Sequence, residues 1–192
     1  MTLSRLTRAA LGVAGALAAS AALALPAQAA SLVVPTDCPA AELTQPFAEW
    51  GDGNNYKLID GASFAAESEA WRLTGGATLR DGRLFLPAGS TATSAPVCVG
   101  HAEPTLRFFG AGTGLAPALT VSVQFQLALT GTWVTLPIGV DTGAAWRPSP
   151  IANIVANFLP APGEYTNVRF VFAPLLSHWE IDDVYVDPWN RA

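Results

Sequence analysis

The sequence predicts an all-β protein, an antiparallel β-sandwich of jelly-roll type preceded by a cleaved signal helix. The first observation is a stretch, 119–130, in which apolar and polar residues alternate without a slip, as in a strand with one buried face. The second is the short spacing of Gly, Asp, Asn and Pro turn residues between such stretches. The third is the lack of any repeat of fixed period, which favours a sandwich over a solenoid or a propeller.

The first 29 residues have the pattern of a secretory signal peptide. Arg5 and Arg8 give a positive start, 9–25 is an almost unbroken apolar run, and 27–29 offers small residues at the positions that a signal peptidase reads. We therefore expect a mature protein that begins at Ala30 and is secreted to the extracellular space, where cysteines oxidise. ATP and nicotinamide cofactors are absent there, and we expect no cofactor.

The rest of the chain divides into an extended N-terminal leader, 30–46, and one jelly-roll domain, 47–189. The leader is rich in Ala, Pro and Thr and has no periodicity, whereas the domain is long enough to bury a core. The segment 151–159 lies between prolines and has apolar residues at helical spacing, which predicts a single short helix or turn. Between the turn signals we expect strands at 56–59, 71–74, 77–80, 83–86, 92–99, 105–109, 119–130, 132–136, 168–172 and 179–186.

The charge balance disfavours two classes of partner. Two of the ten basic residues leave with the signal, so eight basic residues face 15 acidic ones and the formal charge becomes −7. Lys57 is the only lysine and the arginines are scattered singly, so we expect no nucleic acid and no anionic lipid surface as partner. No later segment approaches the roughly 18 apolar residues that span a bilayer, so we expect no membrane insertion after signal cleavage.

The two cysteines, Cys38 and Cys98, both lie in the exported part of the chain. An even count in an oxidising compartment predicts that they form a structural disulfide. The alternative is a soft metal site, which would need further Cys or His ligands, and only His101 is close in sequence.

Two sets of motifs resemble known proteins. The closing segment 179–188 resembles the last strand of the galactose-binding-like jelly rolls that include many carbohydrate-binding modules, and 60–64 followed by Trp71 is similar to their early Asn-Gly-x-Phe-Glu and Gly-Trp stretch. A wider resemblance, to a group of uncharacterised secreted proteins of high-GC Gram-positive bacteria, covers nearly the whole mature chain. It implies a jelly-roll fold and export, and it brings no established activity. Its shared motifs are 38–40 before 45–47, then 50–52, 86–90, 96–100 and 106–109.

The resemblance also raises the question of a metal. Galactose-binding-like jelly rolls often hold a structural calcium with an acidic residue after the early Phe and an Asp of the last strand. Here Ala65 follows Phe64, so one expected ligand is missing. Asp182 or Asp183 could still contribute oxygen ligands at a sheet edge, so a structural calcium stays open.

No motif predicts catalysis. The chain has no nucleophile elbow, zinc-binding helix, phosphate loop or dinucleotide fingerprint, so we predict no catalytic residues. Paired carboxylates, as in glycosidases, are the best enzymatic alternative, with Glu103, Asp141, Asp182 and Asp183 as candidates. Strand alternation predicts that Asp182 and Asp183 point to opposite faces, which argues against a shared substrate.

The tryptophans divide into core and loop positions. Trp71 and Trp179 lie in strand-like apolar stretches and are predicted to be buried. Trp50, Trp133 and Trp146 lie beside turns, where an exposed aromatic ring can stack on a sugar.

These features favour a secreted, non-enzymatic β-sandwich that binds carbohydrate or another cell-surface polymer. The binding residues would be the loop tryptophans together with Gln124 and Gln126 on the polar face of 119–130. The alternative is an extracellular structural or protein-binding module, which an exposed apolar loop patch would favour. A small glycan hydrolase, with two carboxylates in a cleft and at least one raised pKa, is the third hypothesis. The sequence does not specify the oligomeric state.

Overall fold

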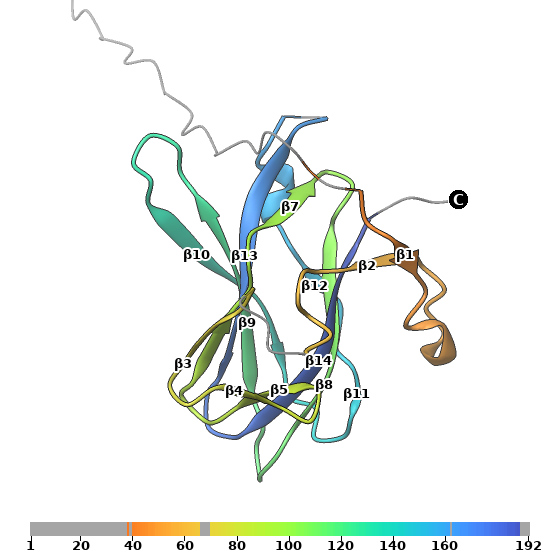
Figure 1. Cartoon of the computed structure of the whole chain (residues 1–192), viewed down its shortest axis with the longest axis vertical. Helices are drawn as coiled ribbons and strands as arrows, with labels where there is room; N and C mark the ends of the chain where they lie inside the picture. Colours follow the sequence, from red (N-terminus) through yellow and green to blue (C-terminus); the bar gives the residue numbers. More distant parts are fainter. Residues whose placement is uncertain (1–37, 39, 66–69, 162, 189–192) are drawn as a thin grey trace, which may run out of the picture.

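Two antiparallel sheets pack face to face and enclose one main core (Figure 1). This computed structural model describes residues 38, 40–65, 70–161 and 163–188. The antiparallel β-sandwich predicted from the sequence is confirmed, because every strand pairing in the described residues is antiparallel. The predicted signal peptide lies outside the described residues. Within them, no helix is long and apolar enough to cross a membrane.

The first sheet is built around two long neighbouring strands, β8 (Thr105–Gly112) and β14 (Trp179–Asp187). Six short strands complete the sheet. They are β1 (Leu43–Thr44), β2 (Tyr56–Leu58), β4 (Thr78–Arg80), β5 (Arg83–Leu86), β11 (Arg147–Pro148) and β12 (Ala152–Asn153). β2 and β5 pair with β14, β11 and β12 pair with β8, β1 pairs with β2, and β4 pairs with β5.

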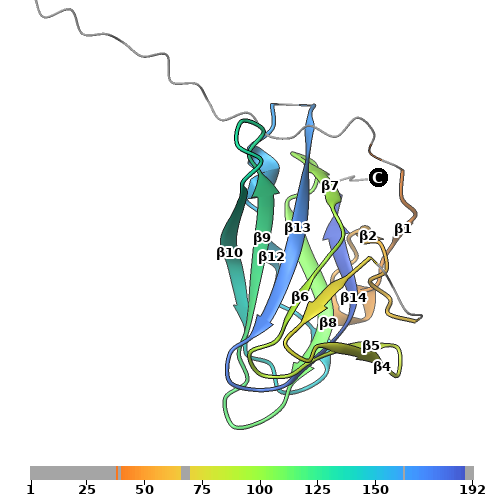
Figure 2. The same cartoon turned by 60° about the vertical axis from the view of Figure 1, so that its left-hand side comes forward.

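The second sheet has three long strands, β10 (Trp133–Asp141), β9 (Leu119–Gln126) and β13 (Tyr165–Pro174), which run side by side in Figure 2. Three short strands complete the sheet: β3 (Arg72–Thr74), β6 (Thr91–Thr93) and β7 (Val97–Gly100). β6 and β7 pair with the edge of β13 that faces away from β9, and β3 pairs with β6. β10 lies at one edge of this sheet, with β3 at the other, and the register of β10 with β9 shifts between Pro137 and Gly139.

The alternation that predicted the strand at 119–130 holds for its first eight residues. In β9 the apolar residues Leu119, Val121 and Val123 are buried in the core, and Gln124 and Gln126 are half-buried on the other face. The prediction is wrong for 128–130, which form a turn where the chain reverses. The Leu127 N–H donates to the Thr132 carbonyl (3.0 Å), which closes a hairpin turn.

At one end of the core, the end of β8 packs tightly against the start of β14 and against the loop that follows β8. Trp71 and Trp179, predicted to be buried, are 5% and 0% exposed. Gly112 lies against Trp179, so that a Cβ built on it would be 2.7 Å from the indole ring and would also collide with Pro117. Only glycine fits at this position.

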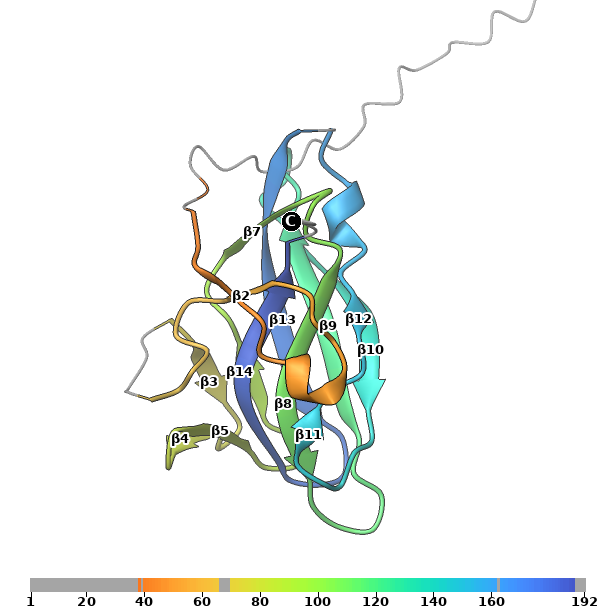
Figure 3. The same ribbon diagram turned by 90° about the vertical axis from the view of Figure 1, so that its right-hand side faces the viewer.

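A second apolar cluster lies on the outer surface of the first sheet. Residues 45–56, which we call the N-terminal strap, include the 3-10 helix η1 (Ala48–Trp50) and cross this sheet in Figure 3. Phe47 and Tyr56 of the strap pack on Phe109 and Tyr185 of the sheet.

One ion pair fastens the strap to β8. Arg107 Nη1 lies 2.5 Å from Asp52 Oδ2, and these side chains are only 12% and 15% exposed. The Tyr56 hydroxyl and the Asn54 N–H also donate to Asp52 (2.7 and 3.1 Å). Arg107 donates in addition to the Ser149 carbonyl, so the ion pair links three separate segments of the chain.

Two further predictions are confirmed. Cys38 and Cys98 form a disulfide, and Lys57 Nζ donates to the carbonyl of Cys98 (3.0 Å). The segment 151–159 contains the short helix expected there, the 3-10 helix η2 (Ala156–Phe158), and β12 precedes it.

Candidate functional site

The solvent-facing side of the second sheet, here called the outer face, is predominantly polar. On β9, Thr120, Ser122, Gln124 and Gln126 alternate with the core residues and therefore face outward. On β13, Arg169 is half-buried between the fully buried Val168 and Phe170, and it also faces outward. The outer face thus carries hydroxyl, amide and guanidinium groups on rigid strands rather than on loops.

Strand register brings together residues that are far apart in sequence. Gln124 lies opposite Thr135 of β10 on one side and opposite Arg169 of β13 on the other. Thr93 of β6 lies between Val171 of β13 and Arg72 of β3. Arg72 and Arg169 therefore share the outer face, with β6 between their strands.

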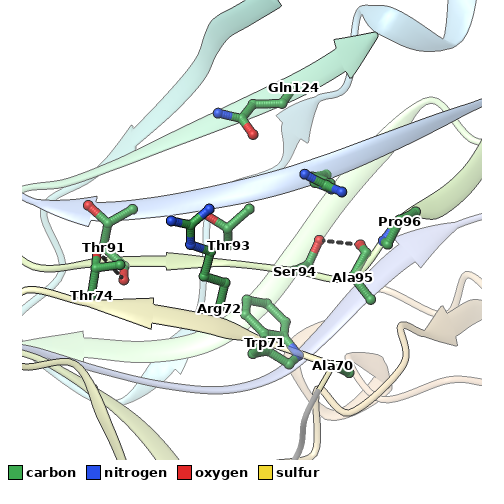
Figure 4. A pocket seen from close by; sticks show the side chains of 11 residues that line it. Ala70, Trp71, Arg72, Thr74, Thr91, Thr93, Ser94, Ala95, Pro96 and Gln124 are labelled. Atoms are coloured by element: carbon green, nitrogen blue, oxygen red, sulfur yellow. Dashed lines mark hydrogen bonds between the residues drawn. The ribbon is translucent and has the colours of Figure 1, made fainter. Parts of the chain in front are cut away.

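A cavity of about 620 Å³ opens on this face (Figure 4). Gln124 lies at one side of it, Arg72 and Trp71 lie at the other, and Thr93 and Ser94 lie between them. The lining combines four hydroxyls, one amide and two guanidinium groups with a few apolar side chains. Its residues are Ala70, Trp71, Arg72, Thr74, Thr91, Thr93, Ser94, Ala95, Pro96, Gln124 and Arg169.

Some of these polar groups already form hydrogen bonds or cation–π contacts within the protein. Gln124 Nε2 donates to Thr135 Oγ1 (3.0 Å), which leaves its amide oxygen directed elsewhere. The Ser94 hydroxyl accepts from the Phe170 N–H (2.9 Å) and donates to the Ala95 carbonyl (2.8 Å). The Arg169 guanidinium carbon lies 4.0 Å from the centre of the Trp133 ring. Within the described residues, no carboxylate forms an ion pair with Arg72 or Arg169.

The cavity has a neighbour along the same sheet. A second hollow of about 330 Å³ shares Pro96 with it and extends toward the disulfide. Lys57, Asp60, Cys98 and Asn167 line this second hollow. Burial lowers the pKa of Lys57, and the carboxylates of Glu103 and Asp60 partly oppose that shift.

The structure separates the five predicted binding residues into two groups. Gln124 lines the cavity, while Gln126 and Trp133 are opposite each other in register on the same face. Gln126 Nε2 donates to the Gly131 carbonyl (2.8 Å), a contact within the hairpin. Trp50 of η1 packs edge-on against Phe109 on the outer surface of the first sheet, and Trp146, in the loop before β11, is covered by the guanidinium of Arg83 from β5 of the same sheet.

The sequence analysis missed the arginines and threonines of the cavity. Arg72, Thr93 and Arg169 lie on strands that only the folded sheet brings together. A signal was present, since Arg169 interrupts the apolar stretch 168–172 and Thr91 and Thr93 flank the buried Ala92. A single charged residue at an outward position of an apolar strand is a candidate for the surface that the sheet displays.

The structure corrects the prediction for Asp182 and Asp183. The strand alternation is broken because the register between β14 and β8 shifts between Asp182 and Tyr185, and Asp183 has a positive φ of 49°. Since Ile181 and Val184 are both in the core, the two aspartates between them lie on the same, outer side of the first sheet. Asp182 accepts a hydrogen bond from the Asp183 N–H (2.9 Å).

The two carboxylates are partly buried, and the pKa of each is raised. Burial and the charge of Asp183 raise the pKa of Asp182 to about 6, and burial also raises the pKa of Asp183. Neither aspartate lines the cavities described above. Among the described residues, no group of three or more His, Cys, Asp or Glu side chains is placed to hold a metal ion.

Comparison with known proteins gives a likeness to solved structures only. No protein-family model matches the chain, and no curated protein matches it. The N-terminal endo-1,4-β-D-xylanase 10B of Clostridium thermocellum, solved as its CBM22-1 and GH10 modules with xylohexaose, aligns with a TM-score of 0.49 and 15% identity, over 71% of this chain and 28% of that one. This chain thus spans little more than a quarter of that protein.

Two other solved structures are carbohydrate-binding modules by themselves. A mutant of a family 29 carbohydrate-binding module has a TM-score of 0.45 and 12% identity, over 69% of this chain and 91% of that one. The C-terminal family 22 module of the Clostridium thermocellum xylanase has a TM-score of 0.43 and 13% identity, over 68% and 94%. At these identities and TM-scores, the likenesses assign this chain neither a family nor a ligand.

Proposed function

We propose that this chain is an exported, non-enzymatic protein that binds a polysaccharide in the cavity on the outer face of the second sheet. The cavity carries the proposal, because it places hydroxyl, amide and guanidinium groups around a space of about 620 Å³. A sugar presents many hydroxyl groups, and a concave site with convergent polar groups is the kind of surface that binds such a ligand.

The sheet itself supports this proposal. Side chains on paired strands are held at fixed spacing, so that little conformational entropy is lost when a ligand is bound. Gln124 is tied to Thr135 and Arg169 lies over Trp133, which limits the motion of both side chains before any ligand arrives. Trp133 also offers an indole beside the cavity, on the same face as Gln126.

Export is part of the proposal. The signal-like residues 1–29 and the resemblance to secreted bacterial proteins favour it. The Cys38–Cys98 disulfide fits an oxidising compartment.

The test is affinity electrophoresis and pull-down on a panel of polysaccharides, with protein secreted from the full-length sequence. We expect Gln124→Ala to weaken binding about fivefold or more, as the loss of a hydrogen bond in a partly buried site does. Trp146→Ala is the matched comparison, since Trp146 lies in the loop before β11, contacts Arg83 of the first sheet and does not line the cavity. Binding that is lost in Trp146→Ala and kept in Gln124→Ala would place the ligand at that loop and contradict the cavity proposal.

A second candidate function, a protein-binding module, is favoured by one observation. Leu115 and Leu176 are almost fully exposed, and Leu175 is 56% exposed beside them. The Leu175 N–H donates to the Ala118 carbonyl (2.9 Å), which joins the two loops at one end of the sandwich. If no polysaccharide binds, these leucines are the surface to substitute in a search for a protein partner.

The hydrolase hypothesis has weaker support. Asp182 has the raised pKa that a general acid needs. The two aspartates nevertheless lie outside the described cavities, on the opposite sheet from the proposed site.

A further inference from the structure

We propose that the polysaccharide bound in this cavity is anionic, a glycan with carboxylate groups on its sugar rings, and that Arg72 and Arg169 recognise those carboxylates. This inference rests on the proposed function, since it names the class of glycan that the same cavity takes.

The charge distribution is the first argument. Without the signal, acidic residues outnumber basic ones by 15 to eight, yet the described lining of the cavity holds two arginines and no acidic residue. Three other arginines are neutralised within the fold. Their ion pairs are Arg83–Glu180, Arg107–Asp52 and Arg147–Asp141. The cavity therefore concentrates positive charge on a protein that is acidic as a whole.

The state of the two guanidinium groups is the second argument. Among the described residues, neither Arg72 nor Arg169 has a carboxylate partner or donates a hydrogen bond. Arg169 stacks on the Trp133 ring, which holds the guanidinium plane but uses none of its N–H groups. A planar group with five free donors matches the two oxygens of a carboxylate.

The spacing of the arginines is the third argument. Arg169 is on β13 and Arg72 is on β3, so their strands are separated by β6 and their backbones by roughly 10 Å across the sheet. Both residues face outward, and the hydroxyl of Thr93 lies between their strands. A chain of sugars lying across these strands would place two of its carboxylates against the two arginines and its hydroxyls against the threonines.

Electrostatic screening makes the local charges decisive. The Debye length is about 8 Å at physiological ionic strength, so the acidic residues elsewhere on the surface act only weakly on a ligand in the cavity. The two arginines would contact the ligand directly. Binding should therefore survive at physiological salt and weaken as salt rises.

The experiment compares polygalacturonate with fully methyl-esterified polygalacturonate, which has the same backbone without the charge. We expect the wild-type protein to bind the acid form at least tenfold more tightly than the ester by isothermal titration calorimetry. Arg72→Gln and Arg169→Gln should each lower the affinity for the acid form about tenfold and leave the affinity for the ester within twofold. Arg80→Gln is the matched control, because Arg80 is on the first sheet and stacks on Phe85.

Further arms distinguish the two proposals from each other. Equal binding of acid and ester, unchanged by the arginine variants, would overturn this inference and leave polysaccharide binding in place. Failure to bind the acid, the ester and every neutral polysaccharide would overturn both. Equally tight binding of dextran sulfate or polyglutamate would show attraction to charge alone and would overturn carboxylate recognition on a sugar. Arg72 is exposed, so the Arg72→Gln variant should unfold at the same temperature as the wild type. Its binding data therefore test the inference even if Arg169→Gln is unstable.

Discussion

Replacing Asp52 with Asn should destabilise the protein by about 3 kcal/mol. In the native structure Asp52 accepts hydrogen bonds from Arg107, Tyr56 and the Asn54 N–H. An asparagine has only one acceptor oxygen, so whichever way its amide is turned, at least one of these donors faces an NH₂ group. The buried charge of Arg107 also loses its counterion.

The magnitude follows from what remains around Arg107. Breaking a fully buried ion pair costs about 3–5 kcal/mol, and a single hydrogen bond to a charged group is worth about 1.5–3 kcal/mol. The Arg107 and Asp52 side chains are 12% and 15% exposed, and Arg107 keeps its two hydrogen bonds to Ser149 and its place over the Phe47 ring. The loss therefore falls at the lower end of the range for a buried pair.

The assay is urea unfolding followed by tryptophan fluorescence, with the disulfide intact. In a thermal scan the same loss of about 3 kcal/mol would lower Tm by about 6–12 °C for a domain of this size. Glu180→Gln is the matched control, because the Arg83–Glu180 pair is 45% and 43% exposed and should be worth less than about 0.5 kcal/mol. If the two variants lose the same stability, the ion pair does not fasten the strap to the sheet.

The pH dependence offers an independent check. Burial acts to raise the pKa of Asp52, but the hydrogen bonds from Tyr56, Asn54 and Arg107 outweigh it and hold the pKa below the ordinary 3.8. A carboxyl with a lowered pKa in the folded state stabilises the fold above the unfolded pKa, and this contribution is lost as the pH falls through the folded value. The gap in stability between wild type and Asp52→Asn should thus be constant from pH 5 to pH 7, as that ordinary pKa implies, and should shrink below about pH 4.

Four further predictions concern the disulfide, Asp182 of β14, calcium and Gly112. The Cys38→Ser, Cys98→Ser double variant should lose about 4 kcal/mol by urea unfolding, since the bond closes a loop with a sequence separation of 60; an unchanged midpoint would contradict this. Asp182→Asn should raise the free energy of unfolding by about 1 kcal/mol above pH 6 and leave it unchanged below pH 4. The folded state raises the pKa of Asp182 to about 6, so the protonated carboxyl stabilises the fold at low pH, and this contribution is lost as the pH rises through the folded value. Calcium at 1 mM, roughly the range of extracellular calcium modules, should leave the Tm of the wild type unchanged, whereas a rise that Asp182→Asn abolishes would assign a metal site to this strand. Gly112→Ala should cost about 3 kcal/mol or more in the same assay, with Gly53→Ala, which meets nothing within 4 Å, as the neutral control.

The sequence predicted a strand correctly where the alternation of apolar and polar residues coincides with a regular strand. The alternation in β9 correctly separates the core residues from Gln124 and Gln126. The same alternation runs on through 128–130, where the chain turns, because a period of two records which residues are apolar and not where the hydrogen bonding ends. In β14 the bulge turns Asp183 to the same side as Asp182, and the sequence carries a mark of it, because the core residues shift from 179 and 181 to 184 and 186.

The candidate site was less predictable, for a physical reason. Its residues come from β3, β6, β9 and β13 and from the segments next to β3 and β6, and their neighbours are set by strand order, which no local pattern encodes. Gln124 was found because its own strand is long and regular. Arg72 and Arg169 look like isolated surface charges in the sequence and become a pair only through β6.

The position of β10 at the margin of the second sheet has a consequence for self-association. A margin with free backbone N–H and C=O groups is a template on which another copy can add a strand, and aggregation spreads in this way. In the described part of the chain no strand pairs with the far side of β10, but Pro137 has no N–H to offer and the register shift beside it interrupts any continuous ladder. This edge of the sheet is therefore a poor template for pairing with a strand of a second copy.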